Sequence, residues 1–120
     1  MHQEPFLQAL RQAPEGQTFQ ATQAFIDTAF HYRPTRFSNG PLVNEAGKNE
    51  GSCKIFAMAL LLGLSESECL QCFGDYYRID VLDNPQAKDH ANIRQFIKTG
   101  YAGLQFDEPA LRLRNSPESR

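Results

Sequence analysis

Eight apolar residues stand together in Ile55-Phe56-Ala57-Met58-Ala59-Leu60-Leu61-Leu62. A helix built from this stretch is apolar on every side, and such a helix is buried in the core of a globular domain. Gly63 suits a left-handed stop at its C-terminal end, with Leu64 contacting the last turn. Upstream, Asn49 or Ser52 is placed to cap the helix start. We therefore expect this helix to be central, with the other elements packed around it.

Two helices are predicted before the central one. The first follows Pro5 and is broken by Pro14-Glu15-Gly16. The second begins at Thr18, a suitable N-cap residue, and carries apolar residues at spacings of three and four. It has to end before Pro34, because proline disfavours a helical residue in front of it.

Helical signals continue after the central helix. Ser65 and Glu68 form the sequence pattern of a capping box. Residues 75–82 fit both periodicities and favour a helix over a strand. Asp89 is placed to cap a last helix that Gly100 can end. The residues of that helix expected to face inward are Ile93, Phe96 and Ile97.

The segments with the sequence pattern of a strand are short. Residues 104–106 and 111–113 alternate around Asp107-Glu108-Pro109, which predicts two strands joined by a turn. Residues 37–43 contain the turn dipeptide Asn39-Gly40, but the following proline removes a backbone donor, so we expect an irregular extended segment. The fold class expected is α+β: one predominantly helical domain over residues 1–114, with a central buried helix, a small antiparallel sheet and a flexible tail at 115–120.

Composition excludes several classes of partner. The 120 residues carry a net charge of −2, with a pI near 5.9 and no basic run, so nucleic acid is not expected to bind. The longest apolar run is far shorter than the roughly 20 residues that cross a membrane, so no membrane span is expected. Residues 1–10 show no secretory signal. Three cysteines, an odd number, indicate free thiols and a cytoplasmic location.

The polar loop 37–54 is where function is expected. A long polar segment costs ordering entropy and adds little core, so it is more often a binding surface than a spacer. A small anion or carboxylate could rest on the helix start that follows it, with Asn49 and Ser52 donating hydrogen bonds. Alternatively, its glycines and asparagines serve only turns and caps. The candidate binding residues in the loop are Asn39, Asn44, Asn49, Glu50, Ser52 and Lys54.

Cys53 and His90 are the candidate catalytic residues. Cys53 falls in the first turn of the central helix, where the helix dipole and Lys54 favour a thiolate, while Glu50 opposes one. His90 could act as the base of a thiol hydrolase. The alternative is that both side chains pack in the core, because cysteine is among the most buried residue types.

A metal or redox centre is not expected. Cys69 and Cys72 have redox-motif spacing but fall inside a helix, which favours core packing. A zinc site would need two further ligands of suitable spacing. The sequence therefore predicts no metal and no cofactor.

Charged residues surround a pair of tyrosines between residues 75 and 94. They could form an internal network that ties the helices to the loop, or ordinary surface ion pairs. The candidate binding residues in this region are Tyr77, Arg78, Asp89, Asn92 and Arg94.

Several blocks together resemble one known family. They are Tyr32-Arg33-Pro34, Phe37-Ser38-Asn39-Gly40, residues 44–56 with Asn49-Glu50-Gly51-Ser52-Cys53-Lys54, residues 73–82, and residues 89–94. With these blocks the chain resembles the HopJ type III effector family from about Phe6 to Leu113. The resemblance implies delivery by a type III secretion system into a host cell, although similar proteins occur in bacteria without that lifestyle. The chain departs from the family pattern at Tyr101, where tryptophan is usual, and at Ala87, where glycine is usual.

Three hypotheses follow for function. The first is a HopJ-like binding or effector module that meets an unknown protein or small-molecule ligand through loop 37–54. The second is a thiol-dependent hydrolase or transferase that uses Cys53 and His90. The third is a housekeeping bacterial protein that is not exported.

Overall fold

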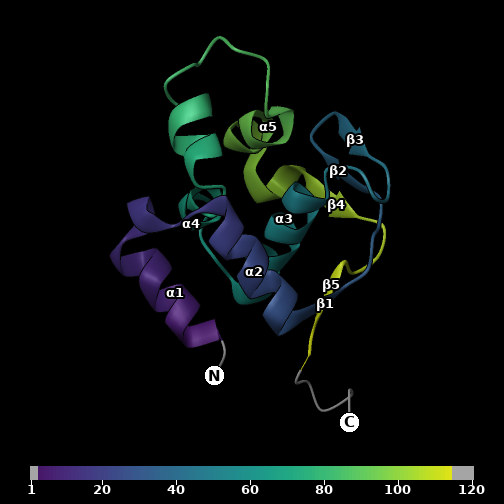
Figure 1. The fold of residues 1–120 in the computed structure, drawn as a ribbon. Coiled ribbons are helices and arrows are strands. Elements are labelled where there is room, and N and C mark those ends of the chain that lie inside the picture. The colour runs from purple at the N-terminus through teal and green to yellow at the C-terminus, as the bar shows by residue number, and fades with distance from the viewer. Residues whose placement is uncertain (1–2, 115–120) are drawn as a thin grey trace.

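The central helix of the computed structural model is α3, Glu50–Leu62, and residues 3–114 are the part of the chain that the structure describes. α3 runs through the middle of the molecule, with α2 lying across it (Figure 1). Its residues from Ile55 to Ala59 are buried, as the apolar run predicts. Leu60 and Leu61 in the last turn are instead 46% and 55% exposed. The tail expected at 115–120 lies outside the described residues.

The N-terminal helices agree with their sequence signals. α1 spans Gln3–Gln12, the short helix η1 spans Pro14–Gly16, and α2 spans Phe19–Ala29. Thr18 caps α2 by accepting a hydrogen bond at Oγ1 from the backbone N–H of Ala21, at 3.0 Å. α2 ends at Ala29 because the next residues join a strand.

The helices after α3 also form, with two corrections. α4 spans Glu66–Gln71 and is followed by η2, a π-helix at Tyr76–Val81. α5 spans Ala91–Thr99, and η3 is a short 3₁₀-helix at Gly100–Gly103. The capping box of Ser65 and Glu68 is present. The prediction that Asp89 caps α5 is wrong: His90 is the N-cap, and the carboxylate of Asp89 binds Arg94. Ile97, expected to face inward, is 48% exposed.

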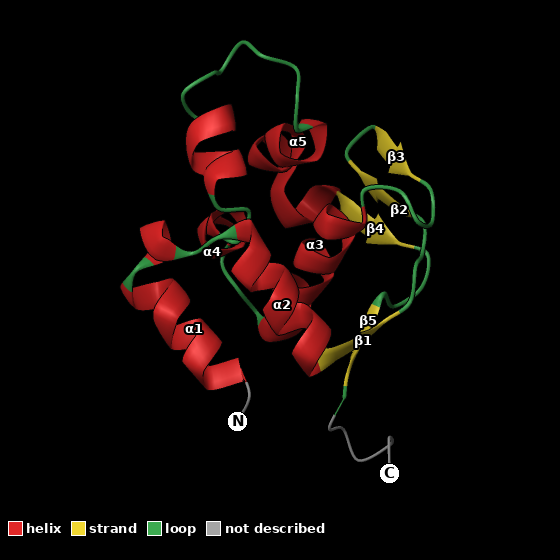
Figure 2. Ribbon diagram, in the orientation of Figure 1, coloured by secondary structure: helices red, strands yellow, loops and turns green. Residues whose placement is uncertain are grey.

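The two C-terminal strands do not form the predicted hairpin. β4, Leu104–Phe106, pairs with β2, Phe37–Asn39, while β5, Leu111–Leu113, pairs with β1, Phe30–Tyr32. Between them, Arg33 N–H donates to Ala110 O and Asp107 N–H donates to Arg36 O, at 2.8 and 3.0 Å. The register is therefore continuous, and residues 104–113 run antiparallel to residues 30–39 as one long ribbon (Figure 2). The apolar alternation predicts both strands correctly, but their partners lie far away in sequence.

The segment at 37–43 is also more regular than expected. β2 pairs with β3, Leu42–Asn44, in a short antiparallel hairpin. Gly40 takes the positive φ of 56° that the turn requires, and Pro41 occupies the turn, where its missing N–H does no harm. Together with β4 this hairpin forms the three-stranded sheet of the α+β fold.

Phe56 lies at the centre of the core. Its ring is 6.1 Å from that of Phe37, 5.5 Å from that of Phe73 and 5.0 Å from that of Phe96, measured between centroids. These contacts join α3 to the sheet, to the segment after α4 and to α5. Among residues 3–114, no helix is long and apolar enough to cross a membrane.

We predict that Gly74→Ala destabilises the fold by about 2 kcal/mol or more. Gly74 has a φ of 64°, and an added Cβ would lie 2.7 Å from the backbone nitrogen of Phe19. The matched control is Gly16→Ala, because Gly16 has no atom within 4 Å of that position. Urea unfolding of the two variants measures the difference, and equal midpoints would contradict the prediction.

Candidate functional site

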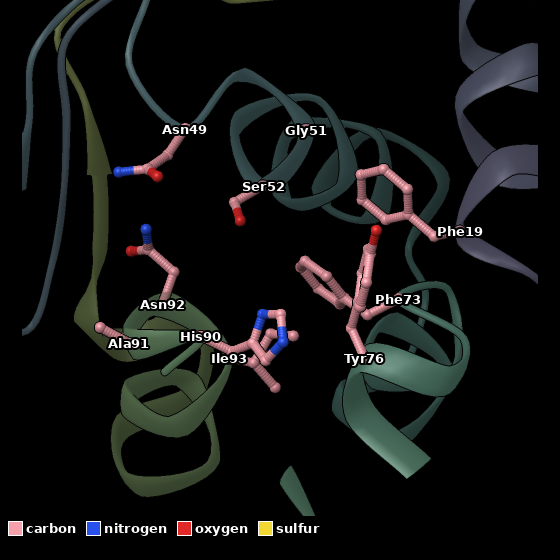
Figure 3. A pocket seen from close by; sticks show the side chains of 10 residues that line it. All are labelled: Phe19, Asn49, Gly51, Ser52, Phe73, Tyr76, His90, Ala91, Asn92 and Ile93. Carbon is pink, nitrogen blue, oxygen red and sulfur yellow. The ribbon is translucent and has the colours of Figure 1, made fainter. Parts of the chain in front are cut away.

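A pocket of about 350 Å³ lies where the starts of α3 and α5 meet. Asn49, Gly51 and Ser52 line it from α3, and residues 90–93 line it from α5. Figure 3 shows the Ser52 hydroxyl directed into this space, between the amide side chains and the aromatic rings. The volume falls within the range of small-molecule sites. The end of the polar loop therefore forms one wall of a cavity large enough for a ligand.

Both helix starts at the pocket lack a side-chain cap. The N-cap residues Asn49 and His90 have left-handed backbones, with φ of 53° and 52°, and neither makes a capping hydrogen bond. They are the non-glycine residues with positive φ within residues 3–114. The first-turn N–H groups of a helix have no partner inside the helix, and the helix dipole makes that end positive. Two such ends at one pocket favour a ligand that accepts hydrogen bonds or carries negative charge.

The opposite wall of the pocket is aromatic. The rings of Phe19 and Tyr76 meet edge to face with centroids 5.0 Å apart, and the Tyr76 ring is 5.0 Å from the His90 ring. His90 Nε2 lies 3.0 Å from Asp80 Oδ2, which fixes the imidazole at the pocket edge. Phe73 completes this side (Figure 3). The pocket thus combines a polar wall with a flat apolar one.

Buried asparagines hold the polar wall in place. Asn44 and Asn92 exchange side-chain hydrogen bonds of 3.2 and 2.9 Å. Asn39 Nδ2 donates to the backbone oxygen and to Oδ1 of Asn92, and Asn49 Nδ2 donates to Asn44 Oδ1. Asn39, Asn44 and Asn92 are each less than a tenth exposed. Asn39 and Asn44 of the predicted binding loop are therefore sealed against α5, whereas Asn49, Gly51 and Ser52 at its end line the pocket.

We predict that Asn92→Ala destabilises the protein by about 2–3 kcal/mol, because it removes the three side-chain hydrogen bonds that join Asn92 to the buried amides of Asn39 and Asn44. Asn84→Ala is the control, since Asn84 is exposed and its side chain donates one long hydrogen bond of 3.3 Å, to Ile79 O. That control should cost under about 1 kcal/mol. Chemical unfolding measures both, and a loss in Asn92→Ala no larger than in the control would contradict the prediction.

Cys53 and His90 do not line the pocket together. Cys53 is 1% exposed and does not line the pocket, whereas His90 does. Burial, followed by the charge of Glu50, raises the pKa of the Cys53 thiol to about 11, although the Tyr32 hydroxyl and Lys54 act in the opposite direction. Within the described chain no hydrogen bond links the thiol to His90, whose partner is Asp80. The geometry gives the thiol-hydrolase hypothesis no support.

We predict that Cys53 in the folded protein reacts with iodoacetamide more slowly than a free thiol at pH 7. Its pKa near 11 leaves it protonated there, and burial blocks access. Mass spectrometry of alkylated peptides measures the rate, and the same protein in denaturant serves as the control. Labelling of the native protein at the free-thiol rate would show a nucleophile.

Two other loop residues face away from the pocket. The Glu50 carboxylate accepts a hydrogen bond of 2.8 Å from the Tyr32 hydroxyl. Lys54 Nζ lies 3.0 Å from Asp27 Oδ1 and 4.8 Å from the centre of the Tyr32 ring. Both side chains therefore tie α3 to α2 and β1.

The charged residues near the tyrosines also connect elements of the fold. Arg78 donates to the backbone oxygens of Pro14 and Gln17 and to Gln71, which joins η2 to the N-terminal segment. Arg94 binds the backbone oxygens of Asp80 and Asn84 and the Asp89 carboxylate, which holds the connection from η2 to α5. Tyr77 is half-buried against the core. These contacts fit an internal network that ties the elements together better than they fit ordinary surface ion pairs.

Asp80, Asp89 and His90 place three potential metal-ligand atoms within 4.8 Å of one another. Arg94 binds Asp89 Oδ1 at 2.7 Å, so one of the carboxylates already faces a cation. A guanidinium in that position opposes the binding of a metal ion.

Sequence reasoning missed the aromatic wall. Phe19, Phe73 and Tyr76 come from three segments that periodicity assigns to helix packing. One signal was present at Gly51, where an added Cβ would lie 2.6 Å from Cζ of Phe19. A glycine in the first turn of a helix can mark such a close approach, but the sequence does not name the group that approaches.

The fold and the site define a small α+β domain with a ligand-sized pocket between two helix starts. The model of the family described as HopJ type III effector protein matches residues 3–111, and the chain belongs to this family. The resemblance drawn from the sequence blocks is confirmed.

One similar solved structure is titled "Crystal structure of unknown function protein VPA0580". It is 45% identical in sequence, the match covers 94% of each chain, and the TM-score is 0.91. No curated protein matches the chain.

Proposed function

We propose that this HopJ family protein is a binding module whose pocket takes a small ligand with a carboxylate or phosphate group attached to a flat ring. The observation that carries the proposal is the meeting of two uncapped helix starts in one pocket. The acidic group would accept hydrogen bonds from the first-turn N–H groups of α3 and α5, near the Ser52 hydroxyl. The nearest carboxylate on α3, that of Glu50, is held by Tyr32 and does not line the pocket.

The aromatic wall supports the second half of this ligand description. A flat ring can stack on or meet the edge of Tyr76 and Phe19, which already pack edge to face. Such rings contribute burial and orientation, while the helix starts select the acidic group. Loop 37–54 would thus act at its end, through Asn49, Gly51 and Ser52.

Benzoate and phenyl phosphate are the probes that test this proposal. We expect each to raise the melting temperature by several degrees at ten times its Kd, because that occupancy adds about 1.4 kcal/mol. Benzamide, which has the same ring without the charge, should bind at least about tenfold more weakly. Amide NMR shifts should concentrate on Gly51, Ser52, Ala91 and Asn92.

Ser52→Asp is the decisive variant, because it puts a negative charge into the pocket and should abolish binding of both anions. Ser67→Asp is its control, since Ser67 is exposed in the first turn of α4 and lies outside the pocket. Equal binding by the two variants, or benzamide binding as well as benzoate, would overturn the proposal.

We further propose that the module acts in a reducing compartment, either the bacterial cytoplasm or a host cell reached by type III delivery. The support is that Cys53, Cys69 and Cys72 are free and buried. Fusion of the full chain to a translocation reporter separates the two: a signal in host cells supports delivery, and its absence supports a protein that is not exported.

A further inference from the structure

A second surface lies at the other end of α3, away from the pocket. It is a groove of about 330 Å³ between the last turns of α3 and the connection from β4 to β5. Ala57, Leu60 and Leu61 form one side, and Phe106 and residues 107–111 form the other. About 12 Å of helix, at about 1.5 Å per residue, separates Ser52 at the pocket from Leu60 in the groove. Its occupation is therefore independent of the proposed function.

The groove is where sequence and fold disagree. The apolar run of α3 predicts burial on every side, yet Leu60 and Leu61 are about half exposed. The adjacent ring of Phe106 is partly buried, and Ala110 and Leu111 behind it are buried. Two neighbouring leucines open to solvent beside a hollow are the kind of apolar surface that marks an interaction site.

The charge at the groove edge is acidic. Asp107 and Glu108 are exposed, and neither carboxylate forms a salt bridge with any residue in 3–114. The nearby Arg36 instead lies 3.9 Å from Glu45. Within residues 3–114, no lysine or arginine lines the groove. An apolar floor with an acidic edge is complementary to an apolar stripe flanked by basic residues.

We propose that this groove binds a basic amphipathic helix of a partner protein. Leucine-type side chains of that helix would fill the space beside Leu60 and Leu61, and a lysine or arginine would face Asp107 and Glu108. This is the helix-in-groove mode, in which apolar residues at spacings of three and four provide anchors. The acidic edge disfavours the alternative of an anionic membrane surface, because it would repel the lipid headgroups.

The test uses the full chain and a fluorescent synthetic helix of about 18 residues, with leucines on one face and lysines on the other. Fluorescence anisotropy measures its Kd. Leu61→Ser should weaken binding roughly tenfold, because it removes an exposed apolar contact. Ile79→Ser is the control: Ile79 is 50% exposed on η2, outside the groove, and its loss should leave Kd within about twofold.

The charge part of the proposal has its own readout. The double variant Asp107→Asn and Glu108→Gln should weaken binding several-fold and flatten its dependence on salt. A peptide with glutamates in place of the lysines should bind at least about tenfold more weakly than the lysine peptide.

Three results would overturn the proposal. They are equal loss in Leu61→Ser and Ile79→Ser, tight binding of the glutamate peptide, and no binding of the lysine peptide. Sedimentation without peptide tests a second copy of the chain as the occupant. A dimer that Leu61→Ser dissociates would assign the groove to self-association instead.

Discussion

Phe56 packs against three other phenylalanine rings, and the arrangement of the whole molecule depends on that contact. Phe37 comes from the sheet, Phe73 from the end of the α4 segment and Phe96 from α5. Because these rings come from distant parts of the chain, they fix α5 against α3. That placement in turn brings Asn92 to Asn44 and sets the two helix starts around one pocket. The polar site is thus positioned by the apolar core beneath it.

Much of the helical part of the fold is legible in the sequence, because its signals are local. Thr18, the capping box at Ser65 and the left-handed Gly63 each act within a few residues. The strand partners are not local. Residues 104–113 alternate as strands do, but nothing within them tells that they pair with residues 30–39 and not with each other. Asn49, one of the two residues expected to cap α3, is its N-cap, whereas the N-cap of α5 is His90 and not Asp89. A left-handed backbone, and not a side-chain hydrogen bond, marks both positions.

The candidate site was likewise predictable only where its signals are local. The polar loop pointed to the right region, but its asparagines have two different tasks that composition cannot separate. Asn39 and Asn44 form hydrogen bonds with Asn92 inside the protein, whereas Asn49 and Ser52 line the pocket. Cys53 follows Ser52 directly, yet the turn of the helix directs it into the core, where burial raises its pKa. Phe19 and Tyr76 reach the pocket through tertiary packing alone.

The long ribbon between residues 30–39 and 104–113 has a consequence for biosynthesis. Residues 104–113 are synthesised about 70 residues after residues 30–39, so β1 and one edge of β2 have no partner until that later segment has been made. Pairings between such remote segments form slowly, because the intervening chain loses entropy when the ends meet. Closure of the two sheets is therefore a late step in folding, after the local helices and the β2–β3 hairpin have formed.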